Sequence, residues 1–318
     1  MYTQNEVMDF IKEEDVKFIK LAFCDIFGKQ RNISITDKEI SLAFDKGIVI
    51  DATNIKGFSD KERFDLLLHP DPSTLSILPW RPEHGRVVRM FCDISHMDGS
   101  PFECDNRMIL KKAIDEAERH GISFSFAPKM EFYLFKLDAN GNKSNETYDK
   151  AGYMDVAPED KGENIRREIC LTLEQMGIEP KSSHHEKGPG QNKINLGLAN
   201  PMTVADNIIT FRQVASTVAN RNGLYADLSP KPIKGAEANS FHFSLSVKTK
   251  DNKDYIKQSV AGVLNRINDL SAFFNKDAEI NSADLKLSNS IANPYTTFAS
   301  IIDSAILGIN NNEELKGK

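Results

Sequence analysis

The sequence predicts a two-part chain in which a compact α+β unit is followed by a larger unit of alternating helices and strands. Short strand patterns follow a single helix in residues 1–104, and from Asp105 onward longer helices alternate with strands. The turn-forming cluster Met97-Asp-Gly-Ser-Pro101 lies at the change of pattern. We therefore expect one domain at 1–104 and a second at 105–318.

The first part begins with a capped helix. Thr3 is followed three residues later by Glu6, a capping-box pattern that predicts a helix over residues 3–14. Residues 16–25 alternate as a strand, and Phe27-Gly28-Lys29 is expected to turn the chain back. Further strands are expected at 30–35, 47–51, 74–77 and 86–94.

The second part shows longer periodic segments. Helices are expected at 106–120, 161–176, 203–222, 253–274 and 294–307. Strands are expected at 124–137, 179–185, 192–198, 225–228 and 239–247. The polar tail at 310–318 is expected to fray.

Composition excludes several classes of function. The chain has 318 residues and a net charge of −6 without a dense Lys/Arg cluster, so neither a nucleic-acid partner nor a membrane partner is expected. The first ten residues are polar and acidic, unlike a signal peptide. Four cysteines without CxxC spacing indicate reduced thiols in a cytoplasmic protein.

Four strand segments place ionisable side chains along one face, because successive strand residues point to opposite sides. In residues 129–135, Lys129, Glu131 and Tyr133 share a face opposite Phe132 and Leu134. The other segments present Lys193 and Asn195; Ser240, His242, Ser244 and Ser246; and Asp284 and Lys286. The pattern fits either an antiparallel sheet with one hydrated face or a shared polar cleft.

Several motifs resemble glutamine synthetase of the bacterial type I class. They are Val16-Lys-Phe-Ile-Lys-Leu-Ala-Phe-Cys-Asp-Ile-Phe-Gly28, Met130-Glu-Phe-Tyr-Leu-Phe135, Gly162-Glu-Asn-Ile-Arg-Arg167, Ser183-His-His-Glu186, Pro189-Gly-Gln191 and Asn293-Pro-Tyr295. The resemblance implies an α+β fold with a small β-grasp-like N-terminal domain. It also implies a glutamine-synthetase-type catalytic domain with a curved antiparallel sheet and flanking helices. The family belongs to nitrogen metabolism: its members are ligases that use ATP and divalent ions to join ammonia to glutamate.

The resemblance carries a set of site residues onto this chain. Glu131, Glu186 and His242 match metal-ligand positions, and Asp284 matches a further one with a shorter carboxylate. Asp51 matches the acidic residue that accepts the ammonium proton in a neighbouring subunit's site. Tyr153 matches a position near the nucleotide, and Ser244 and Ser246 are further candidates for substrate or phosphate contacts.

Departures from the family are concentrated in the same site. Lys129 and Lys193 each occupy a position where the family has a metal-binding Glu. Lys286 replaces an Arg that contacts substrate or phosphate, and a point charge lacks the bidentate fork of Arg. Glu237 and Ala238 replace an Asn-Gly pair that holds glutamate.

A long family segment with the substrate flap and phosphate-binding arginines is also expected to be missing. Residues 275–283 make this connection here, and most of the family's C-terminal extension is expected to be absent too.

The charges of the site residues balance. Glu131, Glu186 and Asp284 are matched by three lysines, Lys129, Lys193 and Lys286. A divalent ion 4 Å from an ammonium would be repelled by about 4 kcal/mol per pair of unit charges at an effective dielectric constant near 20. We therefore expect weak or no binding of Mg²⁺ and Mn²⁺, with ATP and these ions as cofactors only if the family activity is retained.

Two hypotheses remain open. The first is a pseudoenzyme that keeps the fold and acts as a binding, regulatory or structural protein. The second is an active γ-glutamyl-type ligase with altered substrate and metal use, in which lysines hold phosphate directly. In either case the expected partners are further copies of the chain, as a hexameric ring or a smaller oligomer, or a catalytic paralogue in a mixed ring.

Two features near Glu186 are interpreted as structural. Because His184 and His185 point to opposite faces, only one can enter a cleft, and we expect His184 to be the structural one. The segment Gly188-Pro-Gly190 is expected to be a plain turn, since no helix follows it.

Overall fold

The computed structural model describes residues 2–58, 64–81, 83–250, 253–266, 279–281, 284–287 and 289–314. The chain divides into two compact units. The first comprises Met1–Leu110 with Gln175–Gly177, and the second comprises Lys111–Glu174 with Ile178–Lys318. Within the described residues, no helix combines the length and apolar content needed to cross a membrane.

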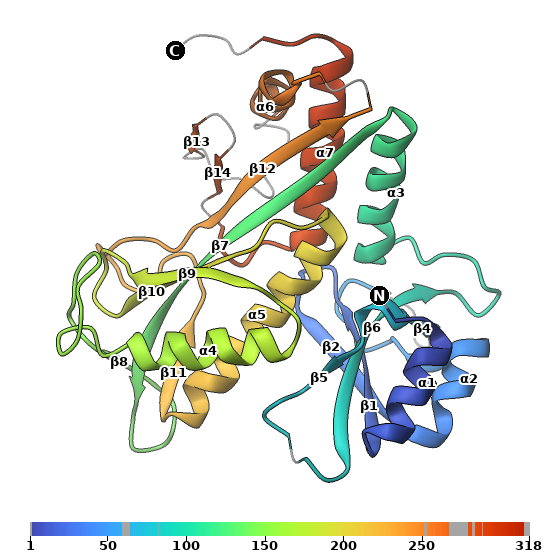
Figure 1. Cartoon of the computed structure of the whole chain (residues 1–318), viewed down its shortest axis with the longest axis horizontal. Helices are drawn as coiled ribbons and strands as arrows, with labels where there is room; N and C mark the ends of the chain where they lie inside the picture. The colour runs from blue at the N-terminus through green and yellow to red at the C-terminus, as the bar shows by residue number, and fades with distance from the viewer. Residues whose placement is uncertain are drawn as a thin grey trace. The chain divides into compact units, whose positions relative to one another are not determined.

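The first unit is a mixed sheet with two helices (Figure 1). Its strands are β1 (Val16–Cys24), β2 (Gln30–Thr36), β3 (Ile48–Asp51), β4 (Asp65–Pro70), β5 (Ser76–Ile77) and β6 (Arg86–Ser95). Their order is β2-β1-β6-β4-β3, with β5 beside β6. The helices are α1 (Gln4–Glu13) and α2 (Ile40–Lys46), and the 3-10 turns η1 (Asp37–Glu39) and η2 (Pro72–Thr74) complete the unit.

Local sequence explains most of this unit. The capping box is confirmed, since the Thr3 hydroxyl accepts a hydrogen bond from the Glu6 backbone N–H and the Glu6 carboxylate accepts from the Thr3 N–H. The expectation of a single helix was wrong, because α2 also forms and buries Ile40 and Ala43. Strand β4 was also not predicted, because three consecutive leucines conceal the alternation between buried and partly buried positions along the strand.

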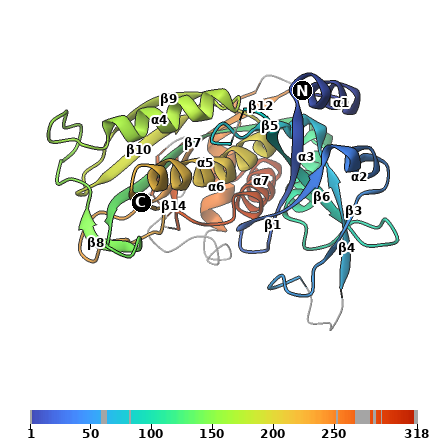
Figure 2. The same ribbon diagram turned by 90° about the horizontal axis from the view of Figure 1, so that it is seen from below.

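The second unit is built on an eight-stranded sheet. Its strands are β7 (Ile122–Leu137), β8 (Lys143–Thr147), β9 (Pro180–His185), β10 (Gln191–Leu196), β11 (Leu224–Asp227), β12 (Phe241–Thr249), β13 (Glu279–Asn281) and β14 (Asp284–Leu287). The order is β13-β14-β12-β7-β10-β9, with β8 and β11 also paired to β7. All of these pairings are antiparallel, and the long strand β7 crosses the middle of the sheet (Figures 1 and 2).

Helices cover one face of this sheet. The helices of the second part are α3 (Asn106–Arg119), α4 (Glu163–Gln175), α5 (Pro201–Arg221), α6 (Ile256–Asn265) and α7 (Pro294–Asn310). Phe126 of β7 stacks on Phe298 of α7 at a ring distance of 4.3 Å, and Phe132 packs edge-on against Phe211 of α5 at 5.9 Å. Since Phe132 faces these helices, Glu131 and Tyr133 point to the other side.

The expectations for the helix at 253–274, the connection at 275–283 and the tail at 310–318 are tested only in part, because some of these residues are not described. The helix predicted at 253–274 is confirmed over Ile256–Asn265, and its remainder from residue 267 lies outside the described residues. Most of the connection at 275–283 also lies outside them. The tail does not fray at its start, because Glu313 pairs with Arg266 at 2.7 Å, whereas residues 315–318 are not described.

Candidate functional site

Cross-strand register brings the predicted polar residues onto one face. Strand β10 places Lys193 opposite Glu131 of β7, and β12 places His242 opposite Lys129. On the next strand, Lys286 lies opposite His242, and Asp284 lies opposite Ser244. Directly opposed residues of antiparallel strands share a face of the sheet. The predicted alternation is therefore confirmed, and the residues face away from Phe132 and its helix.

Lys193 bridges two carboxylates at the centre of this face. Its ammonium donates to Glu131 Oε1 at 2.9 Å and to Glu186 Oε1 at 3.0 Å. The Lys193, Glu131 and Glu186 side chains are 12%, 5% and 13% exposed, so the triad is largely removed from water. The second oxygen of Glu131 accepts from the backbone N–H and the hydroxyl of Ser240, both at 2.8 Å.

The charges of the triad are mutually stabilising. Burial alone would lower the pKa of Lys193, but the Glu131 and Glu186 carboxylates raise it above its ordinary value. Burial alone would raise the pKa of Glu186, but Lys193 and His184 hold it below its ordinary value. Lys193 is therefore a fixed cation at neutral pH.

Lys129 makes a second cation-centred cluster. Its ammonium donates to Asp284 Oδ1 at 3.0 Å and lies 3.4 Å from His242 Nε2. The hydroxyl of Ser244 also donates to Asp284 Oδ1. Burial, together with the positive charges of Lys129 and Lys193, lowers the pKa of His242 to about 4. A neutral imidazole offers one lone pair, and at Nε2 that lone pair faces the Lys129 ammonium.

A cavity of about 270 Å³ opens beside these clusters. Its lining is polar and carries both charge signs: Glu131, Tyr153, Glu186, Lys187, Gln191, Lys193, Glu237, Ala238, His242 and Lys286. Predicted site residues therefore share one cavity with Lys187 and Gln191, which were not predicted. Lys187 directly follows the Ser183-His-His-Glu186 motif and Gln191 ends the Pro189-Gly-Gln191 motif, and these positions were the available signal.

The expectation that His184 is the structural histidine of the pair was wrong. Its Nε2 lies 3.2 Å from Glu186 Oε1, and its ring packs edge-on against Tyr153 at 5.6 Å. His184 therefore lies beside the cavity lining, and the fully buried His185 is the structural histidine of the pair. Strand β9 places His184 opposite Lys193, a pairing that local alternation cannot foresee.

Hydrogen bonds fix the walls of the cavity. The hydroxyl of Tyr133 donates to the Glu237 carbonyl at 2.7 Å, and the Gln191 amide donates to the Ala238 carbonyl at 3.3 Å. The predicted turn at 188–190 is confirmed, and it packs closely: a Cβ on Gly188 would lie 2.0 Å from the Tyr133 hydroxyl oxygen. Only glycine allows this approach without a shift of the turn.

Among the predicted site residues outside the cavity lining, Lys129, Ser244 and Asp284 form the second cluster, whereas Asp51 and Ser246 lie apart from both. Asp51 ends strand β3 in the first unit, where its exposed carboxylate accepts from the Thr53 backbone N–H at 2.9 Å. Ser246 lies on β12 opposite Ser125. For both residues a role in substrate contact stays a prediction.

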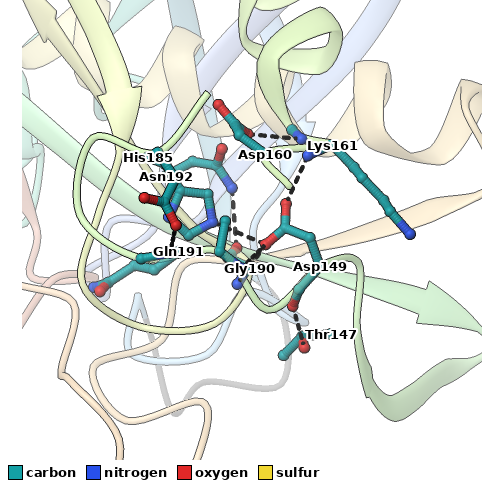
Figure 3. A network of polar contacts seen from close by, with 12 residues as sticks. Thr147, Asp149, Asp160, Lys161, His185, Gly190, Gln191 and Asn192 are labelled. Carbon is teal, nitrogen blue, oxygen red and sulfur yellow. Dashed lines mark hydrogen bonds and ion pairs between the residues drawn. The ribbon is translucent and has the colours of Figure 1, made fainter. Parts of the chain in front are cut away.

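A buried network of polar contacts is centred on Asp149 and His185 (Figure 3). It adjoins Glu186, and the Met154 N–H next to Tyr153 donates to the His185 carbonyl at 3.0 Å. His185 Nε2 lies 2.8 Å from Asp149 Oδ1, and His185 Nδ1 lies 2.7 Å from the Glu186 carbonyl oxygen. Both partners can only accept hydrogen bonds, so both ring nitrogens donate and His185 is an imidazolium. Asp149 also accepts from the Gly190 and Lys161 backbone N–H groups.

The same network contains a group that resembles a metal site. Ligand atoms of Asp149, Asp160 and His185 lie within 4.8 Å of one another, and all three residues are buried. The Arg166 guanidinium, however, donates to both oxygens of Asp160, and the His185 imidazolium donates to Asp149. Cations of the protein therefore compensate these carboxylates.

The His185–Asp149 pair predicts a pH-dependent contribution to stability. Burial alone would lower the pKa of His185, but its hydrogen bonds to Asp149 and Glu186 raise it above its ordinary value. A raised pKa contributes stability that is fully present below the unfolded-state pKa of about 6.5 and is lost as the pH rises through the folded-state pKa. His185→Gln should cost about 2 kcal/mol of unfolding free energy at pH 5.5, and less at pH 9.

Urea unfolding at both pH values measures this difference. His120→Gln is the matched control, because His120 is exposed just after the end of α3 and pairs only with Glu116 among the described residues. An equal cost of His185→Gln at the two pH values would contradict the imidazolium assignment.

Two family models match the chain. The model described as "Glutamine synthetase, beta-Grasp domain" covers residues 15–97, and "Glutamine synthetase, catalytic domain" covers residues 103–282. The β-grasp match falls on the mixed sheet of the first unit, and the catalytic match includes most of the antiparallel sheet.

Curated relatives agree with these models. The chain is 41% identical to a glutamine synthetase of Clostridium saccharobutylicum over 287 residues, which are 86% of this chain and 65% of the relative. It is 42% identical to a glutamine synthetase of Methanosarcina mazei over 252 residues, 79% of this chain and 56% of the relative. The chain thus spans about 56–65% of the length of these relatives.

Solved structures share the fold at lower identity. The glutamine synthetase of Plasmodium falciparum superposes with a TM-score of 0.86 at 21% identity, covering 98% of this chain and 76% of that one. The structure titled "GmaS/ADP complex-Conformation 1" superposes with a TM-score of 0.85 at 22% identity, covering 98% of this chain and 83% of that one. With both halves of the fold, the motifs and the sequence relatives in agreement, the chain belongs to the glutamine synthetase family.

Proposed function

We propose that this chain is a glutamine synthetase homologue that has lost the metal-dependent family reaction and acts as a binding, regulatory or structural protein. The observation that carries the proposal is the Lys193 ammonium between Glu131 and Glu186. The family needs divalent ions for phosphoryl transfer, because they neutralise charge on the phosphates. In this chain a side-chain cation occupies the position between two of the candidate ligands.

The donor set does not fit a divalent ion. Glu131 uses one oxygen for Lys193 and the other for Ser240, and Glu186 Oε1 accepts from Lys193. The Nε2 of His242 and Oδ1 of Asp284 both face Lys129. An ion would have to displace two ammonium groups from largely buried positions while remaining close to their charge.

A second candidate is an active ligase with altered substrate and metal use. Its support is the identity of about 40% to enzymes named glutamine synthetase, together with a cavity that persists beside the lysine clusters. In that case Lys286 or Lys187 would contact phosphate directly, as lysines do in other phosphate sites. Either proposal is compatible with association of this chain with further copies of itself or with a catalytic paralogue in a mixed ring.

The ion-pair triad of Lys193, Glu131 and Glu186 should contribute to the stability of the fold. Lys193→Met removes the cation and leaves Glu131 and Glu186 buried and uncompensated, which should cost about 3 kcal/mol or more of unfolding free energy at pH 7. The additional substitution Glu186→Gln should recover part of this loss. Urea unfolding measures both variants.

Lys181→Met is the matched control. Lys181 pairs with Glu179 at the surface near β9, with side chains 54% and 70% exposed, so its loss should cost less than about 1 kcal/mol. Equal stability of the Lys193 and Lys181 variants would show that the triad does not stabilise the fold.

The second prediction tests the function. Calorimetric titration of the protein with ATP, with and without Mg²⁺ or Mn²⁺, should show no metal-dependent binding. The double variant Lys129→Glu with Lys193→Glu replaces both lysines with the residue type that the family has there, and it should gain affinity for Mn²⁺. Metal-dependent ATP binding by the unmodified protein would refute the proposal and favour the ligase.

A further inference from the structure

A second cavity, of about 470 Å³, lies within the second unit at the start of β7. The ends of α3, β12 and α7 meet there (Figure 1). Its lining residues are Arg119, His120, Gly121, Ile122, Thr249, Lys250, Tyr255, Ile309 and Asn310. None of them lines the candidate site, and Glu131 lies nine residues after Ile122, about 30 Å along β7 at roughly 3.3 Å per strand residue.

We propose that this second cavity binds an organic phosphate monoester, a ligand with a phosphate group and an apolar body. The basis is the convergence of three polar side chains from three separate elements: Arg119 ends α3, Lys250 follows β12, and Asn310 ends α7. A concave site with a small number of convergent polar groups is typical of small-molecule binding. The inference goes beyond the proposed function, because it concerns a different cavity and needs no metal ion.

The two cations of the lining have donors left for a ligand. Arg119 Nε donates to the Asp115 carbonyl at 3.4 Å and one terminal nitrogen pairs with Glu116 at 2.7 Å, so the other terminal nitrogen has no partner among the described residues. Lys250 makes no ion pair with a described residue, and its backbone N–H donates to the Gly121 carbonyl at 3.0 Å. The Lys250 stem lies against Gly121, where a Cβ would be 3.4 Å from Lys250 Cδ. The base of this side chain is therefore held at the cavity.

The charge of the lining favours an anion. No Asp or Glu is among the described residues that line the cavity. Glu116, which pairs with Arg119, also accepts from His120 Nε2 at 3.1 Å, so each of its oxygens already has a donor. Helix C-terminal carbonyls carry partial negative charge. Those in the last turn of α7 accept hydrogen bonds from the backbone N–H groups of Asn311 and Asn312, so the two cations are not required to cap them.

The apolar part of the lining favours an organic ligand over a free phosphate ion. Ile122 is buried and Ile309 is partly buried, and both line the cavity. A volume of about 470 Å³ is larger than a phosphate ion needs and lies within the range of roughly 300–1,000 Å³ of small-molecule pockets. The Asn310 amide, without a hydrogen-bond partner among the described residues, adds a neutral donor and acceptor. The cations therefore suit the phosphate group, and the isoleucines suit the organic body.

Calorimetric titration with phenyl phosphate and, separately, with inorganic phosphate tests the proposal at low ionic strength in EDTA. Phenyl phosphate should bind about tenfold more tightly than inorganic phosphate, because its ring buries apolar surface against the isoleucines. Arg119→Gln and Lys250→Gln should each weaken its binding about threefold, the size expected for one solvent-exposed charge contact. Lys248→Gln is the matched control: this exposed lysine of β12 lies outside the lining, so its loss should leave binding unchanged.

Lys286→Gln distinguishes the two cavities, because Lys286 lines only the candidate site. Binding that is weakened by Lys286→Gln, but not by Arg119→Gln or Lys250→Gln, places phenyl phosphate in the candidate site and overturns the inference. Absence of binding overturns it too, and so does equal affinity for the two probes, which indicates general attraction of anions. Each of these results leaves the loss of metal chemistry at the candidate site standing.

Discussion

The arrangement of the site depends on one ion-pair triad, in which the Lys193 ammonium joins Glu131 of the central strand β7 to Glu186 beyond the end of β9. Without a cation, two largely buried carboxylates would repel each other across this position. The lysine supplies that cation permanently, as part of the chain. The other oxygen of Glu131 binds Ser240 at the start of β12, so the same triad also holds the strand that carries His242.

Around this triad, hydrogen bonds connect the segments that line the cavity. The imidazolium of His185 links the Glu186 backbone to Asp149, and Tyr133 and Gln191 connect β7 and β10 to the segment that carries Glu237 and Ala238. These contacts are buried or partly buried hydrogen bonds with matched donors and acceptors, which specify one arrangement. The walls of the cavity beside the triad are therefore held in place from β7, β9 and β10.

The faces of the strands were predictable, but the partners of the charged residues were not. Alternation with period two is local, so it correctly grouped Lys129 with Glu131 and His242 with Ser244. The pairing register of the strands is set by long-range packing, which local alternation does not report. The three-dimensional arrangement was therefore needed to show that Lys193 pairs with Glu131 and that Lys129 donates to Asp284. His184 was misassigned for the same reason. Helix α2 was missed because seven residues give too few turns for a periodic signal.

The Lys193 ammonium is proposed to replace a metal ion between Glu131 and Glu186. A crystal structure of the protein soaked in Mn²⁺, with anomalous differences recorded for manganese, tests it most directly. We expect density for the Lys193 side chain between the two carboxylates and no anomalous peak within ligand distance of either. A manganese peak coordinated by both Glu131 and Glu186, with Lys193 displaced, would contradict it.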